Sequence, residues 1–269
     1  MKNFSNQIGL ITGGASGIGR LMGELLLLKG LKKLIIWDMN EKLLHQTCEE
    51  LTQKGYQVIG QVIDITNTAQ VIEAVNTINT EVGSVSLLIN NAGIIVGKSF
   101  ADHSHAEIER TLLVNTAAHL HITKEILPSM LAANNGHIVN IASAAGMVSN
   151  PNMSVYVASK WAMLGWSDSL LLELKLKKSN VKVTTVTPFY IDTGMFAGVK
   201  SPIIPIISPM KAVKRIVKGI ECNKRFVRMP RIVYALSFIK GILPASWFDK
   251  IVGQWLGVYR TMDTFKGRY

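Results

Sequence analysis

The stretch ITGGASGIGRL, residues 11–21, places four glycines within seven positions, directly after the first apolar run of the chain. We expect that run, residues 8–12, to be a strand and the glycines to lead into a helix. Gly13, Gly17 and Gly19 would permit a tight turn between the two elements and let a phosphate approach the N-terminus of the helix. The stretch therefore predicts a dinucleotide-binding loop.

The main alternative is the phosphate-binding loop of a nucleoside triphosphatase. Gly14 and Gly19 have the spacing of that loop, but Arg20 and Leu21 follow where Lys and Ser or Thr are required. Such a loop would lack both its cation and its magnesium ligand. The glycines alone also leave open a simple turn with no ligand.

Asp38 is the second signal for a dinucleotide. It ends the apolar run LIIWD after the glycine loop, where a carboxylate can accept hydrogen bonds from the ribose diol of adenosine. Its charge repels a 2′-phosphate, and Met39 and Asn40 follow in place of a cation that would neutralise one. The predicted cofactor is therefore NAD(H) rather than NADP(H).

Apolar runs bounded by turn residues alternate along the chain with stretches of helical periodicity. Buried strands rich in Ile and Val that alternate with helices are typical of a parallel sheet covered on both faces. We therefore expect one doubly wound α/β domain, with residues 1–195 as the dinucleotide-binding and catalytic core and residues 196–269 as a substrate lid and basic amphipathic segment. The expected strands are 8–12, 33–37, 56–63, 86–90, 136–143, 181–187 and 225–229, and the expected helices are 17–29, 41–53, 67–81, 105–133, 154–178 and 209–222.

Tyr156 and Lys160 lie four residues apart in SVYVASKWAM, so a helix would place both on one face. An ammonium about 4 Å from a phenol contributes about 4 kcal/mol at an effective dielectric of about 20, which would lower the pKa of the phenol by about three units. Tyr156 is therefore the candidate general acid and base. Ser143, at the end of the expected fifth strand, is the candidate to hydrogen-bond the substrate oxygen, and Ser149 in the same loop is the alternative.

Several motifs over residues 7–195 resemble those of the short-chain dehydrogenase/reductase family. Thr12-Gly13-x-x-x-Gly17-Ile18-Gly19 resembles its cofactor loop, and Asn90-Asn91-Ala92-Gly93 resembles its fourth-strand signature. The resemblance implies a Rossmann fold and a catalytic tetrad of Asn115, Ser143, Tyr156 and Lys160. With the residues above, the expected cofactor-binding set is Thr12, Gly13, Ser16, Gly17, Ile18, Gly19, Asp38, Asp64, Ile65, Asn91, Ala92, Gly93, Tyr156, Lys160, Pro188 and Thr193.

The roles of the tetrad residues follow from this resemblance. Tyr156 would act as general acid and base, Lys160 would bind the ribose and lower the pKa of the tyrosine, Ser143 would orient the substrate oxygen, and Asn115 would hold a water in the proton relay. Phe189 departs from the family pattern, because many members have Gly after the proline that corresponds to Pro188. It would add an aromatic wall beside the nicotinamide.

The stretches LIIWDMN, TPFYIDTGMF and MDTFKGR are similar to the retinol dehydrogenase and hydroxysteroid dehydrogenase-like branch. This similarity predicts hydride transfer between NAD(H) and a lipophilic alcohol or carbonyl of retinoid, steroid or long-chain type. The competing interpretation is a catalytically silent regulatory or scaffold protein that binds a nucleotide, but the intact tetrad argues against it. The expected substrate-binding residues are Ser143, Met147, Tyr156, Phe189, Tyr190 and Met195, within an apolar wall of Ile94, Val96, Ala145, Phe196 and the isoleucines of the proline-rich flap 201–209.

The formal net charge of +11 comes from the last 74 residues, which hold 14 Lys and Arg against 3 Asp and Glu. Apolar and aromatic residues interleave with these cations in 211–220, 230–244 and 246–260, a pattern typical of a helix that lies in a membrane interface. We therefore expect peripheral contact with an anionic membrane. The alternative is that the apolar face covers the substrate pocket or packs against a second subunit; nucleic acid is not expected as a partner.

Other features of the composition limit the class of protein. Cys48 and Cys222 show no pairing pattern, and no apolar run reaches the length of a spanning helix, so we expect reduced thiols in a cytoplasmic protein that is at most peripheral to a membrane. The histidine pairs lack the further ligands that a metal site needs. The family resemblance implies a homodimer, or a homotetramer, formed through the helices expected at 105–133 and 154–178.

Overall fold

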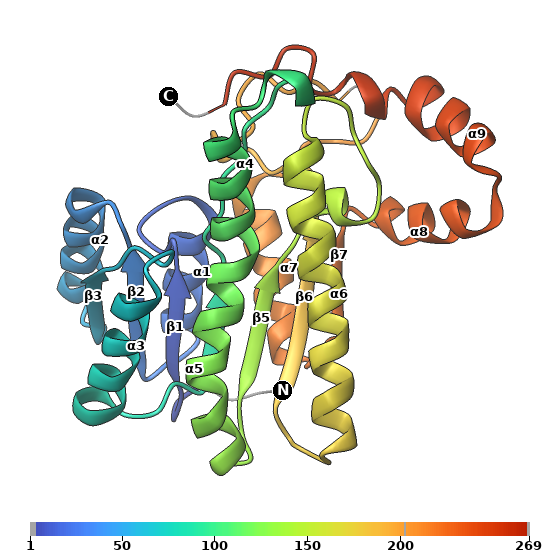
Figure 1. Ribbon diagram of the computed structural model, residues 1–269. Helices are drawn as coiled ribbons and strands as arrows, with labels where there is room; N and C mark the ends of the chain where they lie inside the picture. The colour runs from blue at the N-terminus through green and yellow to red at the C-terminus, as the bar shows by residue number, and fades with distance from the viewer. Residues whose placement is uncertain (1–3, 202, 268–269) are drawn as a thin grey trace.

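The computed structural model describes residues 4–201 and 203–267, and it has a central parallel sheet with helices on both faces (Figure 1). The doubly wound α/β fold is therefore confirmed. The order of the seven strands is β3-β2-β1-β4-β5-β6-β7, so the direction of winding reverses between β1 and β4. The strands are β1 (Ile8–Thr12), β2 (Lys33–Asp38), β3 (Val58–Val62), β4 (Leu87–Asn90), β5 (His137–Ile141), β6 (Lys182–Pro188) and β7 (Phe226–Met229).

The inner strands are buried on both faces, which explains why their sequences are continuous apolar runs. On one face, Ile11 and Ile36 pack with side chains of α1 (Gly17–Leu28), α2 (Glu41–Gln53) and α7 (Pro209–Glu221). On the other face, Leu10 and Ile35 pack with side chains of α3 (Thr68–Thr77), α5 (Ala118–Ala132) and α6 (Ser154–Leu176). Adjacent residues of one strand thus belong to different halves of the core.

The helix expected at 105–133 is interrupted in the structure. It consists of α4 (His105–Leu112), a π-helical turn η3 (Leu113–Ala117) and α5. A similar π-helical turn, η1 (Ile78–Val82), follows α3 where the sequence predicts one helix over 67–81. In η3 the altered winding directs Asn115 inward, where its side chain binds the backbone of Ile94. Because the sequence analysis relied on the 3.6-residue period of an α-helix, it could not predict this contact.

The C-terminal part of the chain projects beyond the sheet at the upper right of Figure 1. It contains α8 (Ile232–Ile242), α9 (Ala245–Phe248) and the turns η5 (Asp249–Trp255) and η6 (Val258–Arg260). Leu236, Phe248 and Val252 of these elements pack against Val148 and Ile204 in a separate small core. No helix within the described residues is long and apolar enough to cross a membrane.

The last described residues return across the segment that follows β6. Lys266 N donates to Ala197 O at 2.8 Å, and Thr264 Oγ1 donates to Gly198 O at 2.6 Å. We call residues 261–267 the C-terminal strap. Its side chains Met262 and Phe265 pack with Tyr156 in one apolar cluster, so the strap covers the sheet edge near Tyr156.

Candidate active site

A cavity of about 710 Å³ lies at the carboxyl ends of β1, β2, β4, β5 and β6. In an open parallel sheet this is the edge where ligands bind, at the point where the winding reverses. Most of the residues expected from the sequence line this cavity: Gly13, Ser16, Gly17, Ile18, Gly19, Asp38, Asp64, Ile65, Asn91, Ala92, Gly93, Ser143, Tyr156, Lys160, Pro188, Phe189, Thr193 and Met195.

The glycine loop has a backbone that side chains would not permit. Gly13 and Gly17 have φ values of 61° and 56°, in the left-handed region that favours glycine. A Cβ atom on Gly19 would lie 2.2 Å from Gly13 O and 2.6 Å from Asn91 Nδ2. The loop at the start of α1 therefore has no room for side chains at these positions, and its backbone is open to a ligand. This backbone surface, which we call the glycine cradle, fits the pyrophosphate of a dinucleotide.

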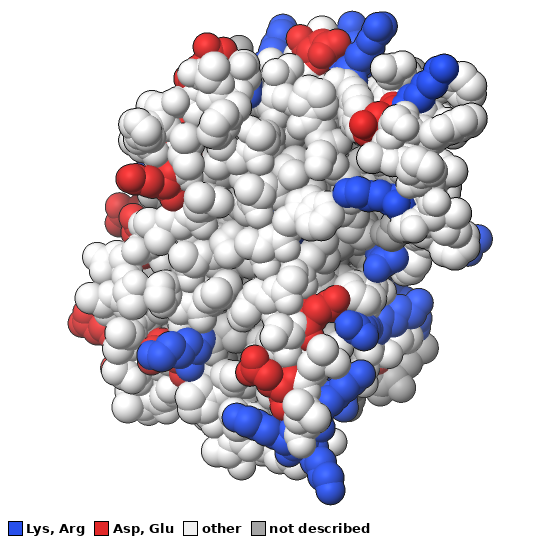
Figure 2. Space-filling model, turned by 45° about the vertical axis from the view of Figure 1, so that its right-hand side comes forward, with Lys and Arg blue, Asp and Glu red and all other residues white. Residues whose placement is uncertain are grey.

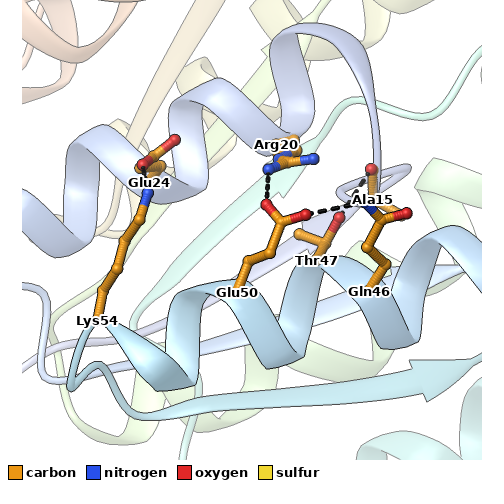
Figure 3. Close-up of polar contacts among 7 residues, drawn as sticks. All are labelled: Ala15, Arg20, Glu24, Gln46, Thr47, Glu50 and Lys54. Carbon is orange, nitrogen blue, oxygen red and sulfur yellow. Dashed lines mark hydrogen bonds and ion pairs between the residues drawn. The ribbon is translucent and has the colours of Figure 1, made fainter.

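Asp38 fixes the loop from the neighbouring strand. Its carboxylate accepts hydrogen bonds from Ala15 N and Asn40 N, both at 3.0 Å. Thr47, which is buried on α2, donates to Ala15 O at 3.1 Å (Figure 3). Together with Asp38, it holds the loop from both sides at Ala15. The sequence analysis did not identify Thr47, because a threonine within a helix carries no signal of a long-range contact.

A second set of contacts joins α1 to α2 below the loop. Arg20 forms an ion pair with Glu50, and Gln46 Nε2 donates to the same carboxylate at 2.9 Å (Figure 3). Lys54 and Glu24 pair one turn further along. Arg20, which excludes a nucleoside triphosphatase loop by its position in the sequence, thus serves to hold α2 against α1.

The loop after β4 is tied to the glycine loop by Thr12, which does not itself line the cavity. Thr12 Oγ1 accepts from the backbone nitrogens of Asn91 and Ala92, each at 3.0 Å, and Asn91 Nδ2 donates to Thr12 O at 2.9 Å. These contacts bring Asn91, Ala92 and Gly93 beside Gly13 at the switch point of the sheet. Thr12 therefore acts through the residues that it holds.

Ser143, Tyr156 and Lys160 meet at the other end of the cavity. Ser143 follows β5 and caps the short turn η4 (Ala144–Gly146), where its Oγ accepts from Ala145 N at 3.1 Å. Tyr156 and Lys160 lie in the first two turns of α6, and Lys160 Nζ is 5.6 Å from the centre of the tyrosine ring. The ammonium donates to Ile141 O at 3.0 Å.

The protonation of these groups is controlled by burial. Burial raises the pKa of Tyr156, and its hydrogen bond with Ser143 offsets part of that rise. This direction is opposite to the one expected from a neighbouring ammonium, because desolvation by burial is the largest influence on the pKa of the phenol, and the Lys160 ammonium donates to the Ile141 carbonyl instead. Burial also lowers the pKa of Lys160 to about 8, so this side chain is still mostly protonated at pH 7.

Asn115 is fully buried behind the cavity and does not line it. Its Oδ1 accepts from Ile94 N at 2.8 Å, and its Nδ2 donates to Ile94 O at 2.9 Å and to Ser159 Oγ at 3.0 Å. His119, one turn further along the chain, has Nε2 at 2.8 Å from Ala92 O, and burial lowers its pKa to about 4. It is therefore a neutral histidine that holds the loop after β4, a role that the sequence analysis did not predict.

The substrate side of the cavity differs from expectation in several residues. Ile94, Phe189, Met195 and Phe196 line the main cavity, but Met147 and Tyr190 do not. Tyr190 is buried and hydrogen-bonds Asn150 and Thr261 instead. The wall is also formed by residues of α4 and η3 and by one residue after β6, none of which the sequence analysis identified: Ala106, Glu109, Arg110, Leu113, Val114 and Ile191.

The proline-rich flap also contributes less to the wall than expected. Ile203 and Ile206 are exposed, Ile204 packs in the small core beside α8, and Ile207 pairs with Ile191 in an isolated bridge. None of these isoleucines lines the main cavity, and neither Val96 nor Ala145 does. Pro202 lies outside the described residues.

Known proteins resemble this chain in sequence, and solved structures resemble it in fold. Epidermal retinol dehydrogenase 2 of Mus musculus is 37% identical over 99% of this chain and 87% of its own length, and retinol dehydrogenase 10-B of Danio rerio is 35% identical over 93% and 81%. The crystal structure of a short-chain dehydrogenase/reductase from Burkholderia phymatum in complex with NAD superimposes with a TM-score of 0.82 at 25% identity, covering 94% of this chain and 97% of that one.

The family model described as short chain dehydrogenase matches residues 7–203, which contain the glycine loop, Asp38 and the Ser143–Tyr156–Lys160 group. This chain belongs to the short-chain dehydrogenase/reductase family and is similar over its whole length to retinol dehydrogenases.

Proposed function

We propose that the protein is an NAD(H)-dependent oxidoreductase that acts on a lipophilic alcohol or the corresponding carbonyl compound. The observation that carries the proposal is that one cavity holds both the glycine cradle with Asp38 and the group of Ser143, Tyr156 and Lys160. The bound nicotinamide would accept or supply the hydride. The protein's own side chains would orient the substrate oxygen and move its proton.

The proton is handled by Tyr156 in this proposal. Its hydroxyl hydrogen-bonds with Ser143, so both hydroxyls can contact one substrate oxygen at the edge of the sheet. Lys160 supplies a positive charge from the same helix face and holds the ribose. Asn115 fixes the Ile94 backbone through two hydrogen bonds and so supports the wall opposite Tyr156.

Asp38 supports NAD(H) over NADP(H). Its carboxylate lines the cavity and is held by two backbone nitrogens, so it cannot turn away from a 2′-phosphate without losing both hydrogen bonds. Met39 and Asn40 provide no cation beside it. The similarity to retinol dehydrogenases and the apolar wall of Ile94, Phe189 and Phe196 support a lipophilic substrate.

Turnover of a panel of retinoids, steroids and long-chain alcohols tests the proposal, with the formation of reduced nicotinamide followed by absorbance. We expect turnover with NAD, and kcat/KM at least about tenfold lower with NADP because Asp38 repels the extra phosphate. A protein that binds NADH but turns over no member of the panel in either direction would instead be the catalytically silent nucleotide-binding protein.

We propose further that the protein docks on an anionic membrane through the outer surface of α8, α9 and η5, which we call the α8–α9 surface. Tyr234, Phe238 and Ile242 follow one another at intervals of four residues on α8, and they are 46%, 71% and 63% exposed. Leu236, between them in the sequence, is buried in the small core. Tyr234 contacts Arg228 and the backbone of β7, while Phe238 and Ile242 form the more exposed, apolar part of the outward stripe.

Two tryptophans and several cations extend this surface. Trp247 and Trp255 are 62% and 69% exposed; Lys250 lies in η5, Arg231 directly precedes α8, and Arg260 lies in η6. With the side that carries α8 and α9 turned forward, Figure 2 shows a largely uncharged face; Lys and Arg predominate along its right-hand and lower edges, with some Asp and Glu among them, and Asp and Glu lie along its left-hand edge. Aromatic side chains flanked by cations are typical of a segment that lies in a membrane interface.

Flotation with vesicles tests this docking. We expect the protein to float with vesicles that contain anionic lipid at low salt, and to bind them several-fold less at high salt or when Phe238 and Trp255 are both replaced by Ser. Leu28→Ser is the matched control, because Leu28 is 70% exposed at the end of α1, on another part of the molecule. Equal flotation of the double variant and the control would contradict the role of the α8–α9 surface.

We also propose a homodimer formed through α5 and α6. Leu172 and Leu176 are 51% and 85% exposed on the outer face of α6, and Leu112 at the end of α4 is partly exposed beside it. A second subunit on this face would bury these side chains.

A further inference from the structure

A second, smaller cavity of about 40 Å³ lies beside the main cavity. Ser143, Phe189 and Phe196 line both cavities. The two phenylalanines, which we call the aromatic partition, therefore form a boundary between the small cavity and the space around Ser143 and Tyr156. The other residues that line the small cavity are mostly apolar, so it could accept a small hydrocarbon group if the boundary were open.

Phe196 packs directly against Tyr156. The two ring centres lie 5.9 Å apart, and the ring planes are nearly perpendicular, at 82°. Such edge-to-face contacts are favourable and fix the position of one ring relative to the other. Because the hydroxyls of Tyr156 and Ser143 are hydrogen-bonded, a substrate oxygen bound between them would place its carbon atom beside the aromatic partition.

Tyr190 supports the aromatic partition from the side of the small cavity. Its ring centre lies 5.0 Å from that of Phe196 and 4.6 Å from that of Phe189. Tyr190 is 5% exposed, and its hydroxyl hydrogen-bonds Thr261 at 2.9 Å. The C-terminal strap also holds the backbone of Ala197, the residue after Phe196. Phe196 is therefore a wall that is braced from behind and along the chain.

The position of this wall limits what the reacting carbon of an alcohol can carry. One of its four bonds leads to the oxygen at Ser143 and Tyr156, and a second holds the hydrogen that leaves as hydride for the bound nicotinamide. The third leads to the lipophilic chain, which needs the larger part of the main cavity. The fourth bond is then the one that meets Phe196. It carries a hydrogen in a primary alcohol and a carbon in a secondary alcohol.

We propose that Phe196 is a specificity-determining residue, which excludes a second carbon substituent from the reacting carbon. This inference rests on the proposed function and narrows its substrate class to primary alcohols and the corresponding aldehydes. The small cavity makes the exclusion removable. Without the ring of Phe196, the vacated space and the small cavity would form one apolar side pocket next to Ser143.

Pairs of alcohols test the role of Phe196. We measure kcat/KM for long-chain primary alcohols, each against the secondary alcohol that differs only by a methyl group on the carbinol carbon. The wild-type protein is expected to favour the primary alcohol by about tenfold or more, because the methyl group must displace a braced ring. In Phe196→Ala the ratio is expected to fall to about threefold or less. A loss of activity common to both alcohols cancels in this ratio.

Phe196→Leu keeps a smaller apolar side chain in the aromatic partition, so its ratio should lie between those of the wild type and Phe196→Ala. It decides the question if the alanine variant does not fold. Phe100→Ala is the matched control, because Phe100 is 63% exposed and lines neither cavity, and it should keep the wild-type ratio.

Two results would overturn the proposal. One is a wild-type protein that turns over both members of each pair with similar kcat/KM, because the ring then moves aside at little cost. The other is a wild-type preference for primary alcohols that survives unchanged in Phe196→Ala, or in Phe196→Leu if that is the variant that folds.

Equilibrium binding separates this proposal from the proposed function. The same alcohols are titrated in the presence of NADH, which cannot oxidise them, and their affinities are measured by calorimetry. A preference for the primary alcohol that Phe196→Ala loses, in a protein that shows no turnover, would support the role of Phe196 while rejecting the oxidoreductase. Turnover with equal affinity for both members of every pair would do the reverse.

Discussion

Replacement of Tyr156 by Phe is expected to lower kcat by about two to four orders of magnitude, the usual contribution of a positioned general acid and base. Tyr156 is 5% exposed and packs with Phe196, Met153 and Met262, so phenylalanine fills the same space and only the hydroxyl is lost. The affinity for NADH should change little, because the glycine loop and Asp38 lie at the other end of the cavity. Steady-state kinetics and a fluorescence titration with NADH measure the two quantities.

Tyr56→Phe is the matched control for this prediction. Tyr56 packs against the core on the face of the sheet that α1, α2 and α7 cover, and it does not line the cavity. We therefore expect kcat to remain at the wild-type level. Turnover by Tyr156→Phe at a rate similar to that of the control would remove the tyrosine from the proton transfer. A large loss of NADH affinity in Tyr156→Phe would show that the hydroxyl itself takes part in binding the nucleotide.

The sequence predicts the sheet more reliably than the helices on its sides. Strands buried on both faces must be apolar throughout, and their ends are marked by Gly, Asn and Asp, so each expected strand is present within a few residues. The π-helical turn η3 could not be predicted in this way. It exists because Asn115 binds the Ile94 backbone, and that contact joins segments that are remote in sequence.

The geometry of the glycine loop was predictable for a related reason. Gly13 and Gly17 have positive φ values, and a side chain on Gly19 would clash with the loop, so glycine is needed at all three positions. Such a need can be recognised from the residues of the loop alone. The apolar side of the cavity, where we expect the substrate, depends on which side chains converge from α4, η3 and the segment after β6. Tyr190 illustrates the difference, because Thr261, which turns it away from the main cavity, lies 71 residues further along the chain.

The pKa of Tyr156 could not be predicted from its spacing to Lys160. Two residues four apart on a helix share a face, but the direction of the ammonium depends on which acceptor it finds. Here that acceptor is Ile141 O, at the end of β5. Tyr156 is buried among Phe196 and the strap residues Met262 and Phe265, and Lys160 is buried as well. Desolvation then raises the pKa of the phenol and lowers that of the ammonium, and neither effect can be inferred without the fold.

Gly19→Ala is expected to weaken NADH binding by about 100-fold or more and to lower the thermal unfolding midpoint. The added Cβ would lie 2.2 Å from Gly13 O and 2.6 Å from Asn91 Nδ2. The first of these atoms belongs to the backbone of the glycine loop and the second is held by Thr12 O and Gly13 O, so neither can move away without opening the cradle. The fluorescence titration and a thermal melt measure both effects.

Gly241→Ala separates this effect from the general consequence of changing a helical glycine. A Cβ on Gly241 meets no other atom within 4 Å, and the residue lies in α8, outside the cavity. Its NADH affinity should equal that of the wild type, and its stability should be unchanged or higher by up to about 1 kcal/mol, since alanine is the better helix former. If Gly19→Ala bound NADH as tightly as Gly241→Ala, the loop at residues 13–19 would not be the nucleotide site, and Asp38 would lose its proposed partner as well.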